Sequence, residues 1–232
     1  RIPPEIINLV NLKELSLEAN ALTGSIPLEL IELTNLEVLE LSDNVLTGFI
    51  PSEIGLLKEL VYLGTARNAL RGQIPSTIGF LTKLVTLLSP ENEHTGTIPK
   101  EVYDLTTLKS LILGFNKFKS SRLPNTIVQL TNLDSLMIPG IGLAGTIPPE
   151  LGSLTNLKIV YLFSNELTGT IPTEIGNLEK AEKIALHFNR LDGTMPEAVC
   201  HLADEHALTT LTVSCGLSSG PECDCCIDCT DM

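Results

Sequence analysis

The chain has 232 residues, of which 43% are hydrophobic and 19% charged, with six cysteines and no tryptophan. Its formal net charge of −13 opposes binding to nucleic acid backbones and to anionic membrane surfaces, so we expect no nucleic-acid partner. The apolar fraction is sufficient for a folded core. No apolar run reaches the ~18 residues of a membrane-spanning helix, so we expect no membrane insertion within this chain.

A leucine pattern with a period of about 24 residues organises the chain, and a period of this size indicates stacked repeats. The pattern starts at Leu12, Leu36, Leu60, Leu84, Leu108, Leu133, Leu157 and Ala181, and only the step before Leu133 is longer, by one position. It predicts a partial repeat over residues 1–11, eight repeats over 12–202, and a last strand with a cysteine-rich cap over 203–232. Because residues 1–11 match only the back half of a repeat, we expect further repeats or a cap upstream in the natural protein.

Each repeat opens with an L-x-x-L-x-L segment such as Leu12, Leu15 and Leu17. Its alternation with period two predicts a short strand whose leucines share one face, and one repeat buries them only by stacking on the next. An asparagine follows at the third position after the last leucine, where its amide can satisfy backbone groups left unpaired by a turn. A ladder is expected at Asn20, Asn44, Asn68, Asn92, Asn116, Asn165 and Asn189.

The back half of each repeat carries L-x-G-x-I-P, as in Leu22, Gly24, Ile26 and Pro27. With the leucine segments, this motif resembles the plant-type leucine-rich repeat family over residues 2–213. The resemblance implies an α/β solenoid: a right-handed superhelix with a parallel β-sheet on the concave face and short 3-10 or irregular turns on the convex face. It also implies an extracellular recognition module, similar to receptor ectodomains and secreted inhibitor-like proteins.

The pattern breaks at several points along the chain. Thr65 and Ser89 replace inward-pointing leucines, and His94 stands where the first repeat has Leu22. Residues 119–122, KSSR, replace a glycine turn, which indicates either a local bend or a partner-contacting protrusion. Ile141 takes an asparagine position and is expected to interrupt the ladder.

Residues between the leucines are expected to line the concave sheet in columns. One column contains Ser16, Glu40, Gly64, Leu88, Ile112, Met137, Tyr161, Ala185 and Thr212. Its apolar middle, with aromatic neighbours, predicts a partner-binding patch, although bulky residues also pack sideways on strand surfaces for purely structural reasons. The predicted partner-binding residues are Tyr62, Leu88, Ile112, Phe115, Met137, Tyr161, Phe163, His187 and Phe188.

The first two repeats are acidic on the same face, which favours a basic partner or only solubilises the chain. Glu37 and Glu40 are expected on an open surface, where nothing would raise the pKa of either carboxyl group as a catalytic pair requires. No nucleophile stands in a motif with a base, and no glycine-rich phosphate loop occurs, so we expect no enzyme and no cofactor.

All six cysteines lie near the C-terminus, at Cys200, Cys215, Cys223, Cys225, Cys226 and Cys229. Their clustering predicts a disulfide-stapled cap and an oxidising compartment, with zinc binding by the last four as the alternative. Such a tail resembles the caps of leucine-rich repeat proteins from diatoms and related algae. Around Cys200, the His201 and His206 spacing fits no standard zinc site, so a solvated insertion loop is expected there.

The function predicted from the sequence is non-catalytic recognition of a protein or peptide through the concave face. One alternative is a structural subunit of a larger assembly. A second is ice or carbohydrate binding by an outer threonine array, which Arg71, Ala144 and Asp192 interrupt. The expected location is extracellular or another oxidising lumen.

Overall fold

The computed structural model describes residues 1–205, 207–214 and 228–229. Two compact units make up the chain, Arg1–Lys119 (unit 1) and Ser120–Met232 (unit 2), and each is described by itself. The division falls within residues 119–122, where the repeat pattern loses its glycine.

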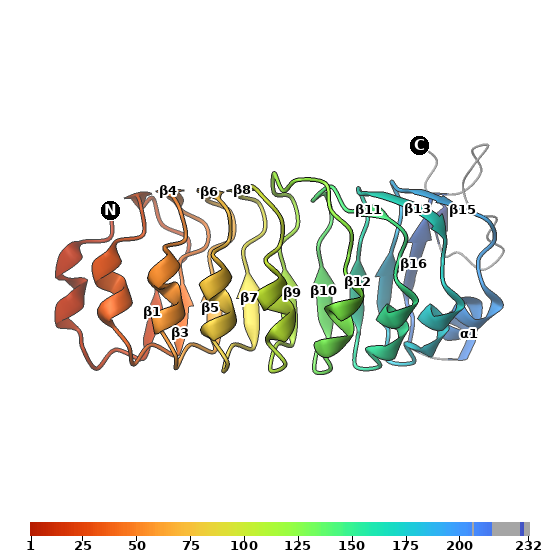
Figure 1. Ribbon diagram of the computed structural model, residues 1–232, viewed down its shortest axis with the longest axis horizontal. Helices are drawn as coiled ribbons and strands as arrows, with labels where there is room; N and C mark the ends of the chain where they lie inside the picture. Colours follow the sequence, from red (N-terminus) through yellow and green to blue (C-terminus); the bar gives the residue numbers. More distant parts are fainter. Residues whose placement is uncertain (206, 215–227, 230–232) are drawn as a thin grey trace. The chain divides into compact units, whose positions relative to one another are not determined.

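Unit 1 contains two parallel sheets and a row of 3-10 helices (Figure 1). The large sheet has the order β1(Glu14–Ser16), β3(Val38–Glu40), β5(Tyr62–Gly64), β7(Thr86–Leu88) and β9(Ser110–Ile112). The small sheet has the order β2(Thr23–Gly24), β4(Val45–Gly48), β6(Ala69–Gly72) and β8(Glu93–His94). The helices are η1(Pro4–Asn8), η2(Leu28–Glu32), η3(Ser52–Leu56), η4(Ser76–Phe80) and η5(Lys100–Asp104).

Unit 2 repeats this organisation. Its large sheet has the order β10(Ser135–Met137), β12(Ile159–Tyr161), β14(Lys183–Ala185), β16(Thr210–Val213) and β17(Asp228–Cys229). Its small sheet has the order β11(Ala144–Gly145), β13(Glu166–Thr170) and β15(Arg190–Asp192). The helices are η6(Asn125–Gln129), η7(Pro149–Ser153), η8(Thr173–Asn177) and α1(Glu197–Glu205).

Strand register follows the repeat period. Leu15 pairs with Leu39 and Leu39 with Leu63 in unit 1, and Leu136 pairs with Val160 in unit 2. Because each residue pairs with its counterpart in the next repeat, the inward side chains of adjacent strands stack on one another. Leu36, Leu60 and Leu84 are accordingly 0% exposed. The stacked parallel repeats confirm the predicted α/β solenoid architecture.

A proline precedes the 3-10 helix of each repeat. Pro27, Pro51 and Pro75 occupy the N-cap with φ between −66° and −74°, the value that the proline ring imposes. The buried side chains of these helices include Leu30, Ile54 and Ile78. The helices thus close the core on the side away from the large sheet, as Figure 1 shows with the helices in front of the strands.

The asparagine ladder is present. The Asn165 side chain accepts from the backbone N–H groups of Ile141 (3.1 Å) and Leu143 (3.0 Å) and donates to three carbonyls, including that of Ile138 at 3.1 Å. Residues directly before the ladder asparagines adopt a left-handed backbone, with φ of 48–56°, at Ala19, Asp43, Arg67, Glu91, Phe115, Ser164 and Phe188. From Asn44 onwards, this turn aims the asparagine amide into the preceding repeat.

The three polar replacements of leucine form one buried cluster in unit 1. Thr65 Oγ1 lies 2.7 Å from Ser89 Oγ, which lies 2.9 Å from His94 Nε2, and all three residues are 0% exposed. Hydrogen bonding offsets the cost of placing them where other repeats have leucine. Burial lowers the pKa of His94 to about 4, although the Gly72 backbone opposes the shift, so the imidazole is neutral at pH 7.

Two features differ from the sequence-based expectation. The L-x-G segments, expected to be irregular, pair between repeats as small parallel sheets because stacking brings their extended backbones together. Residues 197–205, expected to include a solvated loop, instead form helix α1. Val199 and Leu202 on α1 are each 1% exposed, and the helix packs against η8. Their spacing on one helix face, not their polar neighbours, determined the local structure.

We predict that Asn165→Ala lowers the free energy of unfolding by about 3 kcal/mol, because it leaves several buried backbone groups without a partner. Asn20→Ala is the matched control, since Asn20 is exposed and donates only to the carbonyls of Leu17 and Glu18. Urea unfolding measures both variants. Equal losses for the two would contradict the role of the buried ladder.

We also predict that His94 makes the protein less stable in acid. Its pKa is about 4 in the folded protein and near 6.5 when unfolded, so the unfolded chain binds the proton more readily between these values. The contribution of neutral His94 to the free energy of unfolding is therefore fully present above pH 6.5. It falls by up to about 3 kcal/mol as the pH drops towards 4. His94→Leu removes this pH-dependent contribution to the free energy of unfolding. Urea unfolding of the wild type and His94→Leu at pH 7, 5 and 4 measures the difference. Parallel pH profiles of the two proteins would refute the prediction.

Candidate recognition surface

The predicted partner-binding residues lie on the strand face, the outward surface of the two large sheets. In unit 1, Tyr62, Leu88 and Ile112 are half-buried and Phe115 is 49% exposed. In unit 2 the half-buried residues are Met137, Tyr161, Phe163 and His187, and Phe188 is 44% exposed. None of these side chains is submerged, so each retains surface for contact.

Other members of the predicted column do not face solvent. Glu40, Ala185 and Thr212 are only 8%, 5% and 8% exposed. The expectation that the whole column lines an open surface was therefore wrong. The open part of each strand face is narrower and more apolar than the sequence pattern indicated.

Four residues of unit 2 form a continuous set of ring contacts, here called the aromatic strip: Tyr161, Phe163, His187 and Phe188. Phe163 and His187 stack nearly parallel, with an interplanar angle of 6° and a centroid distance of 4.7 Å. Tyr161 meets Phe163 edge-on at 5.8 Å, and Phe188 meets His187 edge-on at 4.9 Å. Both arrangements are favourable for aromatic pairs, so the rings support one another.

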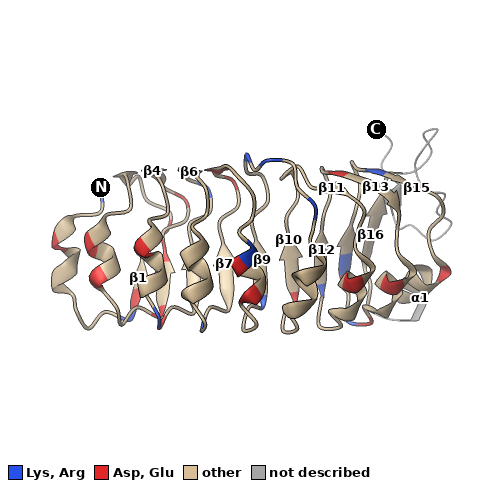
Figure 2. Ribbon diagram, viewed as in Figure 1, with Lys and Arg blue, Asp and Glu red and all other residues tan. Residues whose placement is uncertain are grey.

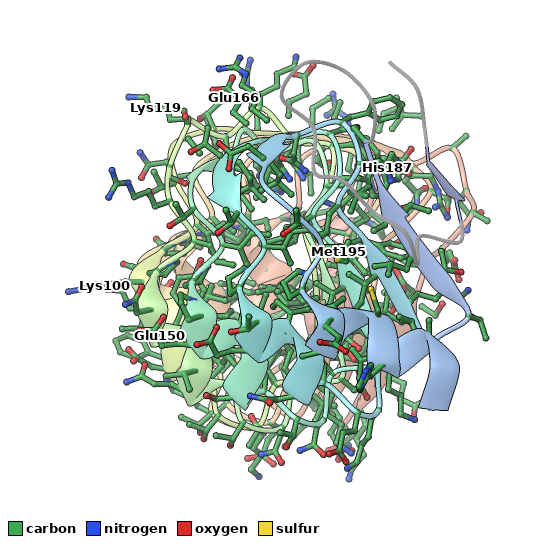
Figure 3. The ribbon with its side chains drawn as sticks, turned by 90° about the vertical axis from the view of Figure 1, so that its right-hand side faces the viewer. Lys100, Lys119, Glu150, Glu166, His187 and Met195 are labelled. Carbon is green, nitrogen blue, oxygen red and sulfur yellow. The ribbon has the colours of Figure 1, made fainter. Side chains whose placement is uncertain are left out.

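Residues that the sequence analysis did not assign to the site hold the strip from strand β16 and the residue after it. His187 Nδ1 lies 2.7 Å from Thr212 Oγ1, and the backbone N–H of Phe188 donates to Ser214 Oγ at 2.7 Å. Burial lowers the pKa of His187, which favours the neutral ring stacked on Phe163. Thr212 and Ser214 lie one repeat downstream of the residues they bind, and this spacing is the signal that could have identified them. Figure 3 shows His187 on the strand side of unit 2, away from Glu150 of η7.

Phe188 occupies a backbone position that disfavours bulky side chains. Its φ is +54°, in the left-handed region that costs an L-residue with a Cβ roughly 1–2 kcal/mol. The turn itself is required by the ladder residue Asn189, but a large aromatic side chain is not. The same conformation recurs before the other ladder asparagines, so the strain belongs to the repeat turn and does not single out Phe188.

Carboxylates on the strand face of unit 1 have hydrogen-bond and ion-pair partners within the protein. Glu40 was expected on an open surface but is buried. Its carboxylate accepts from the Tyr62 hydroxyl at 2.6 Å and from the Ser42 N–H at 2.8 Å. Glycine at position 64 allows this, since a Cβ there would lie 2.6 Å from Glu40 Cδ. Burial, together with the bond to Glu40, raises the pKa of Tyr62.

Ion pairs between neighbouring repeats also neutralise this face. Lys13 Nζ lies 2.6 Å from Glu37 Oε1, and Arg67 makes a two-point contact with Asp43 that lowers the pKa of the Asp43 carboxyl. These exposed pairs add little stability. They reduce the negative charge available to a basic partner on the strand face of unit 1.

The cysteine cluster is described only in part. Cys200 lies on α1 and is disulfide-bonded. Cys215, Cys223, Cys225 and Cys226 fall outside the described residues, and the side chain of Cys229 is not described. Within the described part of the chain, no group of three or more His, Cys, Asp or Glu is placed to hold a metal ion. Nor does any helix in that part have the length and apolarity needed to cross a membrane.

We predict that Gly64→Ala displaces the Glu40 carboxylate and breaks its bond to Tyr62. The pKa of Tyr62 then falls towards the ordinary tyrosine value, because one of the causes of its elevation is lost. Tyrosine ionisation followed by ultraviolet absorbance between pH 8 and 12 measures the change. Gly48→Ala is the control, as Gly48 neighbours Ser25 instead, and an unchanged Tyr62 titration in Gly64→Ala would contradict the arrangement.

Comparison with known proteins identifies the repeats. A family model described as Leucine Rich Repeat matches residues 11–33, 35–57 and 156–178. Curated protein sequences give no match. A plant ice-binding protein of known structure is 24% identical over 96% of this chain and 79% of its own, with a TM-score of 0.71, a similarity that shows the fold alone.

Two receptor structures from Arabidopsis thaliana are also similar. The leucine-rich repeat ectodomain of the membrane receptor kinase GASSHO1/SCHENGEN3, in complex with CASPARIAN STRIP INTEGRITY FACTOR 2, is 35% identical over 92% of this chain, with a TM-score of 0.86. The receptor kinase HAESA, in complex with the peptide hormone IDA and the co-receptor SERK1, is 35% identical over 93%, with a TM-score of 0.86. This chain spans 26% and 36% of those receptor chains. With its repeats, ladder and L-x-G-x-I-P turns, the chain belongs to the plant-type leucine-rich repeat family.

Proposed function

We propose that the chain is a non-catalytic recognition module that binds a protein or peptide partner through its strand face, with the aromatic strip of unit 2 as the main contact. The observation that carries the proposal is the strip itself: four linked rings on a solvent-accessible sheet, in a chain with only 4% aromatic residues. Aromatic residues are enriched at protein interfaces, and tyrosine and tryptophan are enriched among the residues that contribute most to binding.

The strip is organised before any partner arrives. Hydrogen bonds to Thr212 and Ser214 fix His187 and the Phe188 backbone, and stacking holds Phe163. A side chain that is already ordered loses little conformational entropy on binding, so more of the contact energy appears as affinity.

The class of partner is supported by the related structures. GASSHO1/SCHENGEN3 and HAESA are each solved with a protein or peptide bound, the latter with a peptide hormone. By analogy, the ligand of this chain is a protein or peptide segment. The same analogy supports a location outside the cell or in another oxidising lumen, where the disulfide bond of Cys200 would be stable.

Ice binding is not favoured by any specific observation. It needs a flat, regular threonine array, whereas the residues after the turn glycines in unit 1 include Phe49 and Gln73, which cover Gly72 and Gly96. The remaining alternative, a subunit of a larger assembly, would use the same exposed rings. A stoichiometric complex on purification of the natural protein would distinguish it from reversible recognition.

We predict that Tyr161→Ser with Phe188→Asn weakens binding of selected peptides at least tenfold, corresponding to a loss of about 2 kcal/mol of contact energy. The peptides come from a random library displayed on phage and panned against the wild-type chain. Because asparagine tolerates a left-handed backbone, Phe188→Asn alone leaves the free energy of unfolding unchanged or higher.

Phe49→Ser is the control, since Phe49 is 57% exposed but lies beside the small sheet of unit 1. It retains wild-type affinity under the proposal. Peptides that bind the double variant as tightly as the wild type would refute the assignment of the strip.

A further inference from the structure

The 3-10 helix side of unit 1 carries an apolar pocket that the strand-face function does not use. Leu56, the last residue of η3, and Phe80, the last residue of η4, are 56% and 58% exposed. They border an open surface pocket of about 170 Å³ lined by Ser52, Glu53, Gly55, Leu56, Thr77 and Phe80. An apolar cavity of roughly 150 Å³ holds a benzene molecule, so this one has room for one bulky apolar side chain.

The pocket is built into the packing of η3 on η4. Gly55 forms its floor, and a Cβ there would lie 2.9 Å from Thr77 Cβ and 3.2 Å from Phe80 Cδ2. The Thr77 hydroxyl donates to the Ser52 carbonyl and ties the two helices together. The cavity therefore does not depend on a mobile loop.

Carboxylates lie on one of the two pocket helices and on the helices that flank them. At the position that Leu56 and Phe80 occupy, the neighbouring helices η2 and η5 end in Glu32 and Asp104. Their first turns carry Glu29 and Glu101, and η3 carries Glu53. Figure 2 shows acidic residues on this row of helices. Within the described residues, no ion pair involves any of these five carboxylates, unlike Glu37 and Asp43 on the strand face.

Basic residues on this surface are fewer. Lys100 begins η5, and Lys58 follows η3. Lys58 Nζ lies 4.5 Å from the centroid of the Phe80 ring and donates to the Phe80 carbonyl at 3.3 Å. One face of the ring thus already contacts an ammonium group, a favourable cation–π arrangement. The surface around the pocket remains negative, with five carboxylates against two ammonium groups.

We propose that this surface, the helix-side pocket, docks a basic amphipathic segment of a partner protein. A leucine or phenylalanine of the segment fills the cavity between Leu56 and Phe80. Its lysine or arginine residues lie against Glu32, Glu53 and Asp104. The charge selects this occupant: a second copy of the chain, with a net charge of −13, and an anionic membrane are both repelled.

The probe is a 14-residue amphipathic peptide of leucine and lysine, labelled for fluorescence anisotropy. Two matched peptides separate the contributions: one replaces lysine with glutamate, and one replaces leucine with serine. The leucine–lysine peptide binds at least tenfold more tightly than either, and its affinity falls as salt rises. Equal binding of the serine–lysine peptide would mean that the peptides bind by non-specific charge attraction alone, and it would overturn the proposal.

Variants locate the site on the chain. Phe80→Ser and Glu32→Lys with Asp104→Lys each weaken binding at least tenfold, whereas Val45→Ser, at an equally exposed position on β4, does not. Thermal unfolding verifies that each variant is folded. Tyr161→Ser with Phe188→Asn leaves this affinity unchanged, so the result is independent of the strand-face proposal. Binding that is insensitive to Phe80→Ser, or lost in the aromatic-strip variant, would refute the helix-side pocket.

Discussion

The stacking of one repeat on the next is the constraint on which the rest of the structure depends. A single repeat has no second layer to cover its leucines, so it can bury them only against the equivalent leucines of its neighbours. Parallel pairing of Leu15 with Leu39 and of Leu39 with Leu63 follows from this requirement. Every other position then recurs beside its counterpart one repeat away, which turns single side chains into columns.

These columns explain both the features that all repeats share and the features that only a few repeats have. The ladder asparagines after Asn20 repeat because each satisfies backbone groups of the preceding repeat, as Asn165 does for Ile141 and Leu143. Where a column changes residue type, new chemistry appears. Thr65, Ser89 and His94 replace three leucines and form a hydrogen-bonded cluster in the core. On the surface, the change to Phe163 and His187 in one column produces the stacked rings of the aromatic strip.

The two surfaces differ in how their charges are arranged. On the strand face of unit 1, Glu40 lies across Gly64 and accepts from Tyr62, and Asp43 pairs with Arg67. That face is internally satisfied, which leaves the rings of unit 2 as the better contact. On the helix side, the carboxylates of η2, η3 and η5 around the apolar cavity make no ion pair in the part of the chain that the structure describes. The same repeat scaffold thus presents an aromatic surface and an acidic-apolar one.

The sequence by itself determined the repeat length, the parallel strands, the buried leucines and the asparagine ladder, because these depend only on residues that recur once in every repeat. It also identified the rings of the aromatic strip. Tertiary structure decided which of the alternating residues remain exposed, since Glu40 and Thr212 are each only 8% exposed. It also decided that residues 197–205 form α1, and that Gly55 and Phe80 border an open pocket. Such outcomes depend on the sizes of side chains about one repeat apart, and a one-dimensional pattern does not contain that fit.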